Sequence, residues 1–138
     1  MPIDKGSQEL IAEANARIET IPPEEAIGLL GDERVQLVDL RDIRERQRDG
    51  FIPSSYHAPR GMLEFWVDPE SPYHKKIFDQ PKKFVFYCAS GWRSALATRT
   101  VQEMGLAPVA HVGGGFSGWE DAGGETMKTE DGREPRRA

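Results

Sequence analysis

One cysteine occurs in the 138-residue chain, and its sequence surroundings favour a nucleophile. Cys88 follows an aromatic and β-branched run, 84–87, which predicts a buried strand. After a short loop, apolar residues recur at helical spacing from Trp92 to Met104, and Gly105 suits the position just past a helix end. Cys88 is therefore expected where a strand leads into a helix N-terminus. The free N–H groups and positive dipole end there stabilise an anion, so a thiolate at this position would be a good nucleophile at neutral pH.

A lone cysteine can also be an inert core residue, because free cysteine is among the most often buried side chains. The residues after Cys88 argue against that reading. Gly91, Arg93 and Ser94 make a loop that can close around an anion.

Residues 88–94 read Cys-Ala-Ser-Gly-Trp-Arg-Ser and resemble the active-site loop of the rhodanese family. Members of that family are thiosulfate and persulfide sulfurtransferases, and their loop reads Cys-x-x-Gly-x-Arg-Ser/Thr. A second family signature, Asp-x-Arg followed by an acidic residue and a Gly-His-Ile-Pro-Gly-Ala turn, resembles residues 39–55, with Phe51 in place of the usual His and two serines in place of Gly-Ala. A third, a Gly-Gly-x-x-x-Trp run that begins the last helix, resembles 113–119. A phosphate-binding glycine loop is disfavoured there because no Lys-Ser/Thr follows.

Strands alternate with helices along the chain, which predicts an α/β protein with a parallel sheet covered on both faces. The resemblance implies the rhodanese-like form of this class, a five-stranded, mainly parallel sheet with helices on both faces. We expect three parts: an N-terminal helical extension over 1–16, the rhodanese-like domain over 17–124, and a mobile polar tail over 125–138. The expected helices span 7–16, 23 to 29 or 30, 43–49 and 92–104, and residues 60–67 form a helical or loop segment. The expected strands span 17–21, 35–40, 56–58, 84–87 and 109–112.

The resemblance implies a two-step reaction at Cys88. The thiolate attacks the outer sulfur of thiosulfate or of a persulfide, the rest of the donor leaves, and the Cys88 persulfide passes its sulfur to cyanide or a thiol, which can belong to a protein. Amides from Ala89 to Arg93 are expected to surround the charged sulfur, and Arg93 to bind the sulfonate of the donor. No cofactor and no metal is required. The expected substrate-binding residues are Ala89, Ser90, Gly91, Trp92, Arg93, Ser94 and Arg41.

Arg41 and Glu45 are four residues apart and can pair on a helical turn. Such a pair can be a solvated surface contact of little energetic weight. Alternatively, Arg41 adds positive potential near the thiolate, because ligands of open α/β sheets bind beyond the carboxyl ends of strands, where both Arg41 and Cys88 are expected. The family resemblance implies that Asp39 and Glu45 support this region.

Two other functions compete with sulfur transfer. Cysteine phosphatases and arsenate reductases of a related fold also place a Cys before an Arg, but with five residues between them, whereas four separate Cys88 from Arg93. The smaller ring of amides suits one sulfur atom better than a tetrahedral phosphate. The second alternative is a sulfur carrier or protein-interaction module without enzymatic activity.

The formal net charge of -5 gives no electrostatic reason to expect nucleic acid or an anionic membrane as a partner. We find no apolar run long enough to span a bilayer, and the single cysteine makes an internal disulfide impossible, so the cytoplasm is the expected compartment. His57, His74 and His111 lack the spacing of a metal site, and we expect structural or surface roles for them rather than general-base catalysis.

Overall fold

The computed structural model describes residues 2–135, and its centre is one five-stranded sheet in the order β1-β5-β4-β2-β3. Every pairing in this sheet is parallel. The α/β class, the five strands and the parallel sheet predicted from the sequence are confirmed. The strands are β1 (Glu19–Ile21), β2 (Val35–Asp39), β3 (Tyr56–His57), β4 (Lys83–Tyr87) and β5 (Val109–Val112).

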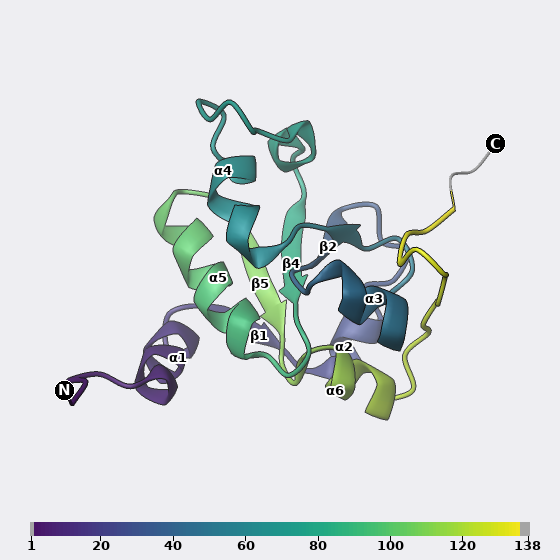
Figure 1. The fold of residues 1–138 in the computed structure, drawn as a ribbon, viewed down its shortest axis with the longest axis horizontal. Helices are drawn as coiled ribbons and strands as arrows, with labels where there is room; N and C mark the ends of the chain where they lie inside the picture. The colour runs from purple at the N-terminus through teal and green to yellow at the C-terminus, as the bar shows by residue number, and fades with distance from the viewer. Residues whose placement is uncertain (1, 136–138) are drawn as a thin grey trace.

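Helices cover both faces of the sheet, with α1, α4 and α5 on one face and α2, α3 and α6 on the other (Figure 1). The side chains of β4 alternate between the two resulting cores, as the pleat of a strand requires. Phe84 and Phe86 belong to the core under α4 and α5, whereas Val85 and Tyr87 belong to the core under α2 and α6. The helices are α1 (Ser7–Asn15), α2 (Pro23–Ile27), α3 (Ile43–Asp49), α4 (Leu63–Val67), α5 (Trp92–Glu103) and α6 (Gly115–Asp121), with short 3-10 turns at Arg60–Met62 and Lys76–Asp79.

The N-terminal helix α1 packs on α5 through a small apolar cluster that includes Ile11, Ala14 and Ala95. Ser7 is the first helical residue of α1, Gly6 occupies the cap, and no side chain caps the helix. Since α5 begins just after the Cys88 loop, its contact with α1 places the N-terminal helix close to that loop (Figure 1).

The segment after Gly124, for which the sequence predicts a mobile polar tail over 125–138, contacts the rest of the domain in its described part. Met127 and Phe51 form an antiparallel bridge, with N–O distances of 2.8 and 2.9 Å, and the carbonyl of Gly132 accepts a hydrogen bond of 2.8 Å from Arg46 Nε. The sequence of this segment is polar, so it lacks the apolar pattern of a packed element; hydrogen bonds to backbone groups hold it instead. The last three residues lie outside the described part of the chain.

Within residues 2–135, no helix combines the length and the apolar character needed to cross a lipid bilayer.

Candidate active site

Cys88 lies where β4 ends and the loop before α5 begins, as predicted from the sequence. The backbone N–H of Gly91 donates to its sulfur at 3.2 Å, and that of Ser94 at 3.4 Å. The Ser94 hydroxyl lies 3.6 Å from the same sulfur. Two amides therefore donate to Cys88 Sγ and stabilise negative charge on it, while the Ser94 hydroxyl oxygen accepts from the thiol.

The loop can curl around the sulfur because Gly91, the residue before α5, adopts φ 104°. The first turn of α6 fixes the loop from the other side. The N–H of Phe116 donates to the carbonyl of Cys88 at 2.7 Å, and that of Ser117 to the carbonyl of Ala89 at 3.1 Å. The glycine-rich run before α6 is thus the part of the chain that supports the Cys88 loop.

The sulfur is well shielded, because Cys88 is only 1% exposed. Ser90 and Trp92 on the same loop are exposed, Trp92 at 58%. They line an open hollow of about 270 Å³ beside the loop. The loop therefore has a solvent face next to a sulfur that is itself covered. The hollow is lined by Ile11, Asn15, Thr20, Ser90, Gly91, Trp92, His111, Gly113 and Gly114.

Of the amides expected to surround the sulfur, those from Ala89 to Arg93, the N–H of Gly91 donates to Cys88 Sγ. The N–H of Ser94, one residue beyond that range, also donates to it. Ala89 contributes its carbonyl to the contact with α6. Ser90 lies on the hollow.

Glu45 forms its ion pair with Arg93 and not with Arg41, the partner that the sequence spacing suggested. The two terminal nitrogens of Arg93 donate to the two carboxylate oxygens of Glu45, each at 2.9 Å. These hydrogen bonds lower the pKa of Glu45 and raise that of Arg93. The possible pairing of Arg41 with Glu45 was wrong because the partner of Glu45 comes from α5, a distant part of the chain that helical spacing cannot reveal.

Arg41 is buried, with 1% of its side chain exposed, rather than open to a substrate. Its Nε and Nη2 donate to the carboxylate of Asp39 at 3.0 and 2.9 Å, and Nη2 also donates to the carbonyl of Gly50 at 2.8 Å. Its guanidinium lies 4.4 Å from the centre of the Phe116 ring. The expectation that Arg41 binds substrate directly is therefore corrected. Its guanidinium is buried and donates to the carboxylate of Asp39, two residues away.

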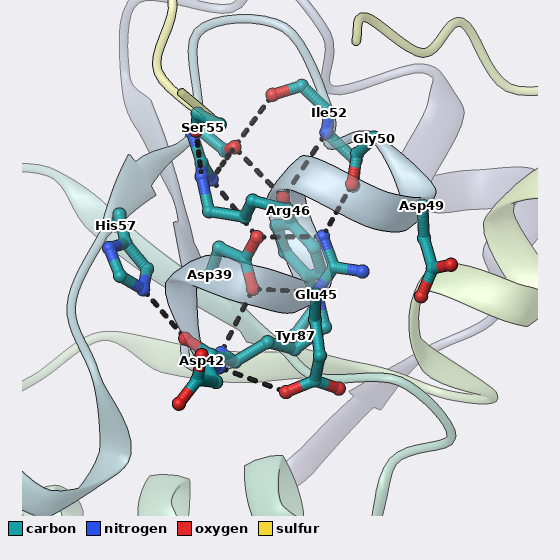
Figure 2. A network of polar contacts seen from close by, with 12 residues as sticks. Asp39, Asp42, Glu45, Arg46, Asp49, Gly50, Ile52, Ser55, His57 and Tyr87 are labelled. Atoms are coloured by element: carbon teal, nitrogen blue, oxygen red, sulfur yellow. Dashed lines mark hydrogen bonds and ion pairs between the residues drawn. The ribbon is translucent and has the colours of Figure 1, made fainter. Parts of the chain in front are cut away.

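A second buried arginine, Arg46, completes this ion cluster and was not singled out from the sequence. Its Nη1 donates to Asp39 at 2.9 Å and to the Ser55 hydroxyl at 3.2 Å, as Figure 2 shows. Burial raises the pKa of Asp39, but hydrogen bonds from Arg41 and the charges of both arginines outweigh it and hold the pKa below its ordinary value. The guanidinium of Arg46 also lies 4.0 Å from the centre of the Phe51 ring. Phe51, which replaces the family His, is therefore a fully buried packing partner of this cluster.

His111 on β5 is also connected to Cys88, and no sequence spacing indicated it. Its Nδ1 lies 2.8 Å from the Ser94 hydroxyl. Its Nε2 lies 3.1 Å from both Thr20 Oγ1 and Asn15 Oδ1. Burial lowers the pKa of His111 to about 4, so the imidazole is neutral at pH 7.

The sequence profile described as rhodanese-like domain matches residues 22–122. The chain belongs to the rhodanese-like domain family. It is 34% identical over 95 residues to the "Putative sulfurtransferase YtwF" of Bacillus subtilis, covering 69% of this chain and 80% of that protein. It is 30% identical over 104 residues to the thiosulfate sulfurtransferase GlpE of Pseudoalteromonas translucida, covering 75% and 90%.

A solved structure from Rhodopseudomonas palustris is also similar to this rhodanese-like domain. It has a TM-score of 0.89 and 55% sequence identity, and the match covers 92% of this chain and 98% of that one. That protein is described as having unknown function and as a possible tyrosine phosphatase.

The matched range of the rhodanese-like domain leaves out residues on both sides that contact the site. α1 and β1 lie before it and supply Asn15 and Thr20, which both contact His111. The C-terminal segment lies after it and supplies the Gly132 carbonyl to Arg46. Within residues 2–135, no group of three His, Cys, Asp or Glu side chains could hold a metal ion.

Proposed function

We propose that this rhodanese-like domain is a sulfurtransferase that moves a sulfane sulfur from thiosulfate or a persulfide to an acceptor through a persulfide on Cys88. The observation that carries the proposal is the convergence of the Gly91 and Ser94 amides on Cys88 Sγ. These amides are fixed before any substrate binds, so they stabilise charge on the sulfur without reorganisation.

In the first half-reaction the Cys88 thiolate attacks the outer sulfur of the donor. A sulfur–sulfur bond forms to Cys88 while the sulfur–sulfur bond of the donor breaks, and sulfite leaves with the electron pair when the donor is thiosulfate. In the second half-reaction cyanide or a thiolate attacks the outer sulfur of the persulfide, and the Cys88 thiolate is released.

Arg93 acts in this proposal by its charge near Cys88. The Arg93 side chain is 42% exposed, and its pKa is raised chiefly by the hydrogen bonds to Glu45 and also by the charge of Cys88. A guanidinium in this place attracts an anionic donor, although its terminal nitrogens already bind Glu45. Arg41 contributes as part of the buried cluster with Asp39.

The sulfur donor reaches Cys88 from the solvent face of the loop. Because Cys88 is 1% exposed, side chains flanking the loop must shift before an attacking geometry forms. Exposed Trp92 is the large side chain on that face, and it therefore also contacts a protein thiol that serves as acceptor. A reducing compartment such as the cytoplasm suits a reaction that needs its single cysteine as a free thiolate.

Formation of thiocyanate from thiosulfate and cyanide tests the proposal. We expect turnover by the wild-type protein and none by Cys88→Ser, with unchanged circular dichroism in the variant. Equal turnover by Cys88→Ser would show that another group carries the sulfur.

A phosphatase is the second candidate, and the description of the similar Rhodopseudomonas palustris protein favours it. The loop argues against it, because four residues separate Cys88 from Arg93 and the amides of Gly91 and Ser94 lie on the sulfur itself. Five intervening residues, as in cysteine phosphatases, make a wider ring. Hydrolysis of an aryl phosphate that depends on Cys88, without thiocyanate formation, would reverse this ranking.

A further inference from the structure

A continuous line of polar atoms runs from the Cys88 sulfur to the hollow beside the loop. Ser94 Oγ lies 3.6 Å from Cys88 Sγ, and His111 Nδ1 lies 2.8 Å from Ser94 Oγ. On the far side of the imidazole, Nε2 lies 3.1 Å from Asn15 Oδ1 and 3.1 Å from Thr20 Oγ1. Both of these side chains line the hollow.

The partners of His111 decide which nitrogen carries the proton in the resting thiol state. Asn15 Oδ1 is only an acceptor, so His111 Nε2 must carry the hydrogen that it receives. A neutral imidazole has one N–H, which makes Nδ1 an acceptor. The Ser94 hydroxyl therefore donates to Nδ1 and offers a lone pair to the Cys88 thiol.

This arrangement does not suit a charged sulfur. A serine hydroxyl has a single proton, and while it points at His111 Nδ1 it cannot point at Cys88. A thiolate or persulfide anion requires the Ser94 proton for itself. His111 can release it by carrying its own proton on Nδ1, in which case Nε2 accepts a hydrogen bond from the Thr20 hydroxyl.

We propose that His111 is a positioning residue that acts on Cys88 through Ser94, holding the thiol in its Nε2–H form and the thiolate and persulfide in its Nδ1–H form. The inference rests on the proposed function only in assigning a persulfide to Cys88. It also gives α1 a role, since Asn15 selects the resting form.

The proton balance of the exchange is complete. The Cys88 proton passes to Ser94 Oγ, the Ser94 proton passes to His111 Nδ1, and the Nε2 proton passes to solvent water at the hollow. The thiol loses one proton, water gains one, and the imidazole stays neutral. Since Cys88 is 1% exposed, this route connects a covered sulfur to solvent.

The charged groups near the sulfur do not disturb this account. Arg93 on α5, whose charge acts on Cys88, is paired with Glu45 on α3, while the Asp39 carboxylate at the end of β2 binds both Arg41 and Arg46. His111 has hydrogen-bonding neighbours that are uncharged, and burial lowers its pKa to about 4. Above about pH 5.5 the His111 ring therefore stays neutral, and only its tautomer changes.

Nitrogen-15 NMR spectra of the histidine rings show directly which ring nitrogen of His111 carries the proton. We expect the wild-type His111 signals to change from the Nε2–H to the Nδ1–H pattern when the Cys88 thiolate forms, and ultraviolet absorbance follows that thiolate independently. Cys88→Ser cannot form the anion and is expected to keep the Nε2–H pattern throughout. In Ser94→Ala the thiolate still forms, but His111 no longer responds to it.

His74→Asn is the matched control, because His74 bonds to Asp79 away from the loop. It removes the His74 signals, leaves those of His57 and His111, and is expected to keep the His111 change intact. A thiolate that forms in the wild type without any change at His111, or a change that persists in Ser94→Ala, would overturn the inference. Sulfur transfer is not needed for this measurement, so its outcome is separate from that of the thiocyanate assay.

Discussion

The two carboxylate oxygens of Glu45 accept hydrogen bonds of 2.9 Å from the two terminal nitrogens of Arg93. This two-pronged contact joins α3 to the first turn of α5, directly after the Cys88 loop. Glu45 also accepts a hydrogen bond of 2.9 Å from the backbone N–H of Asp42, and so closes the capping box of α3. A single carboxylate thus orients a helix start and a guanidinium near Cys88.

Opposite effects on donor binding are expected from the two members of this pair. Arg93→Ala removes a positive charge near Cys88 and should raise the KM for thiosulfate about tenfold, with a smaller effect on kcat. Glu45→Gln keeps the size of the side chain but leaves Arg93 unneutralised, and should lower that KM a few-fold at low salt. Steady-state kinetics at two ionic strengths measure both. A rise in KM of equal size for both variants would mean that the pair only holds the loop in place.

Asp39→Asn is expected to destabilise the protein by about 3–5 kcal/mol, because it leaves the buried Arg41 and Arg46 without their shared carboxylate. Urea unfolding at pH 7 measures the loss. Asp32→Asn is the matched control, since its ion pair with Arg34 lies at the surface, and it should change the unfolding midpoint little. Similar losses from the two variants would contradict the structural weight given to the Asp39 cluster.

Gly115→Ala tests the contact between α6 and the Cys88 loop. A methyl group at Gly115 would lie 2.5 Å from the Cys88 carbonyl oxygen and 2.7 Å from that of Ala89, and the loop would have to move. Gly123 has a comparable positive φ of 86° but nothing within 4 Å, so Gly123→Ala carries the backbone strain alone. We expect Gly115→Ala to be less stable than Gly123→Ala by about 2 kcal/mol or more and to lose sulfur transfer. Equal stability and activity in the two variants would refute this contact.

The buried His111 should make the protein sensitive to mild acid. Its folded-state pKa of about 4 lies below the ordinary value of 6.5, so the unfolded chain binds a proton between these pH values while the folded chain does not. Acidification from about pH 7 to about pH 5 therefore favours unfolding, by about 2 kcal/mol from this residue. His111→Asn should lack this contribution, as urea unfolding at the two pH values can measure. An identical loss of stability in both proteins would contradict the burial of a neutral His111.

The local order of elements around Cys88 could be predicted because each depends on neighbours in the sequence. The apolar run before Cys88 and the helical spacing after it gave β4 and α5 nearly to the residue, and Ile43–Asp49 and Val109–Val112 have the expected bounds. Helix α2 ends at Ile27, earlier than its apolar residues suggested, because a turn replaces its last part.

The polar partners could not be predicted, since they are chosen by the fold. Glu45 lies four residues from Arg41, yet it binds Arg93, which the sheet brings to it. His111 has no sequence relationship to Cys88 and reaches it only because β5 lies next to β4. The C-terminal segment binds through backbone groups, whose hydrogen bonds leave no pattern in side-chain types.

The mass of the intact protein after treatment with thiosulfate tests the central proposal most directly. We predict a gain of one sulfur atom per chain, located on Cys88 by fragmentation, absent in Cys88→Ser and lost when cyanide is added. An unchanged mass, under conditions in which the wild-type protein forms thiocyanate, would contradict a persulfide on Cys88.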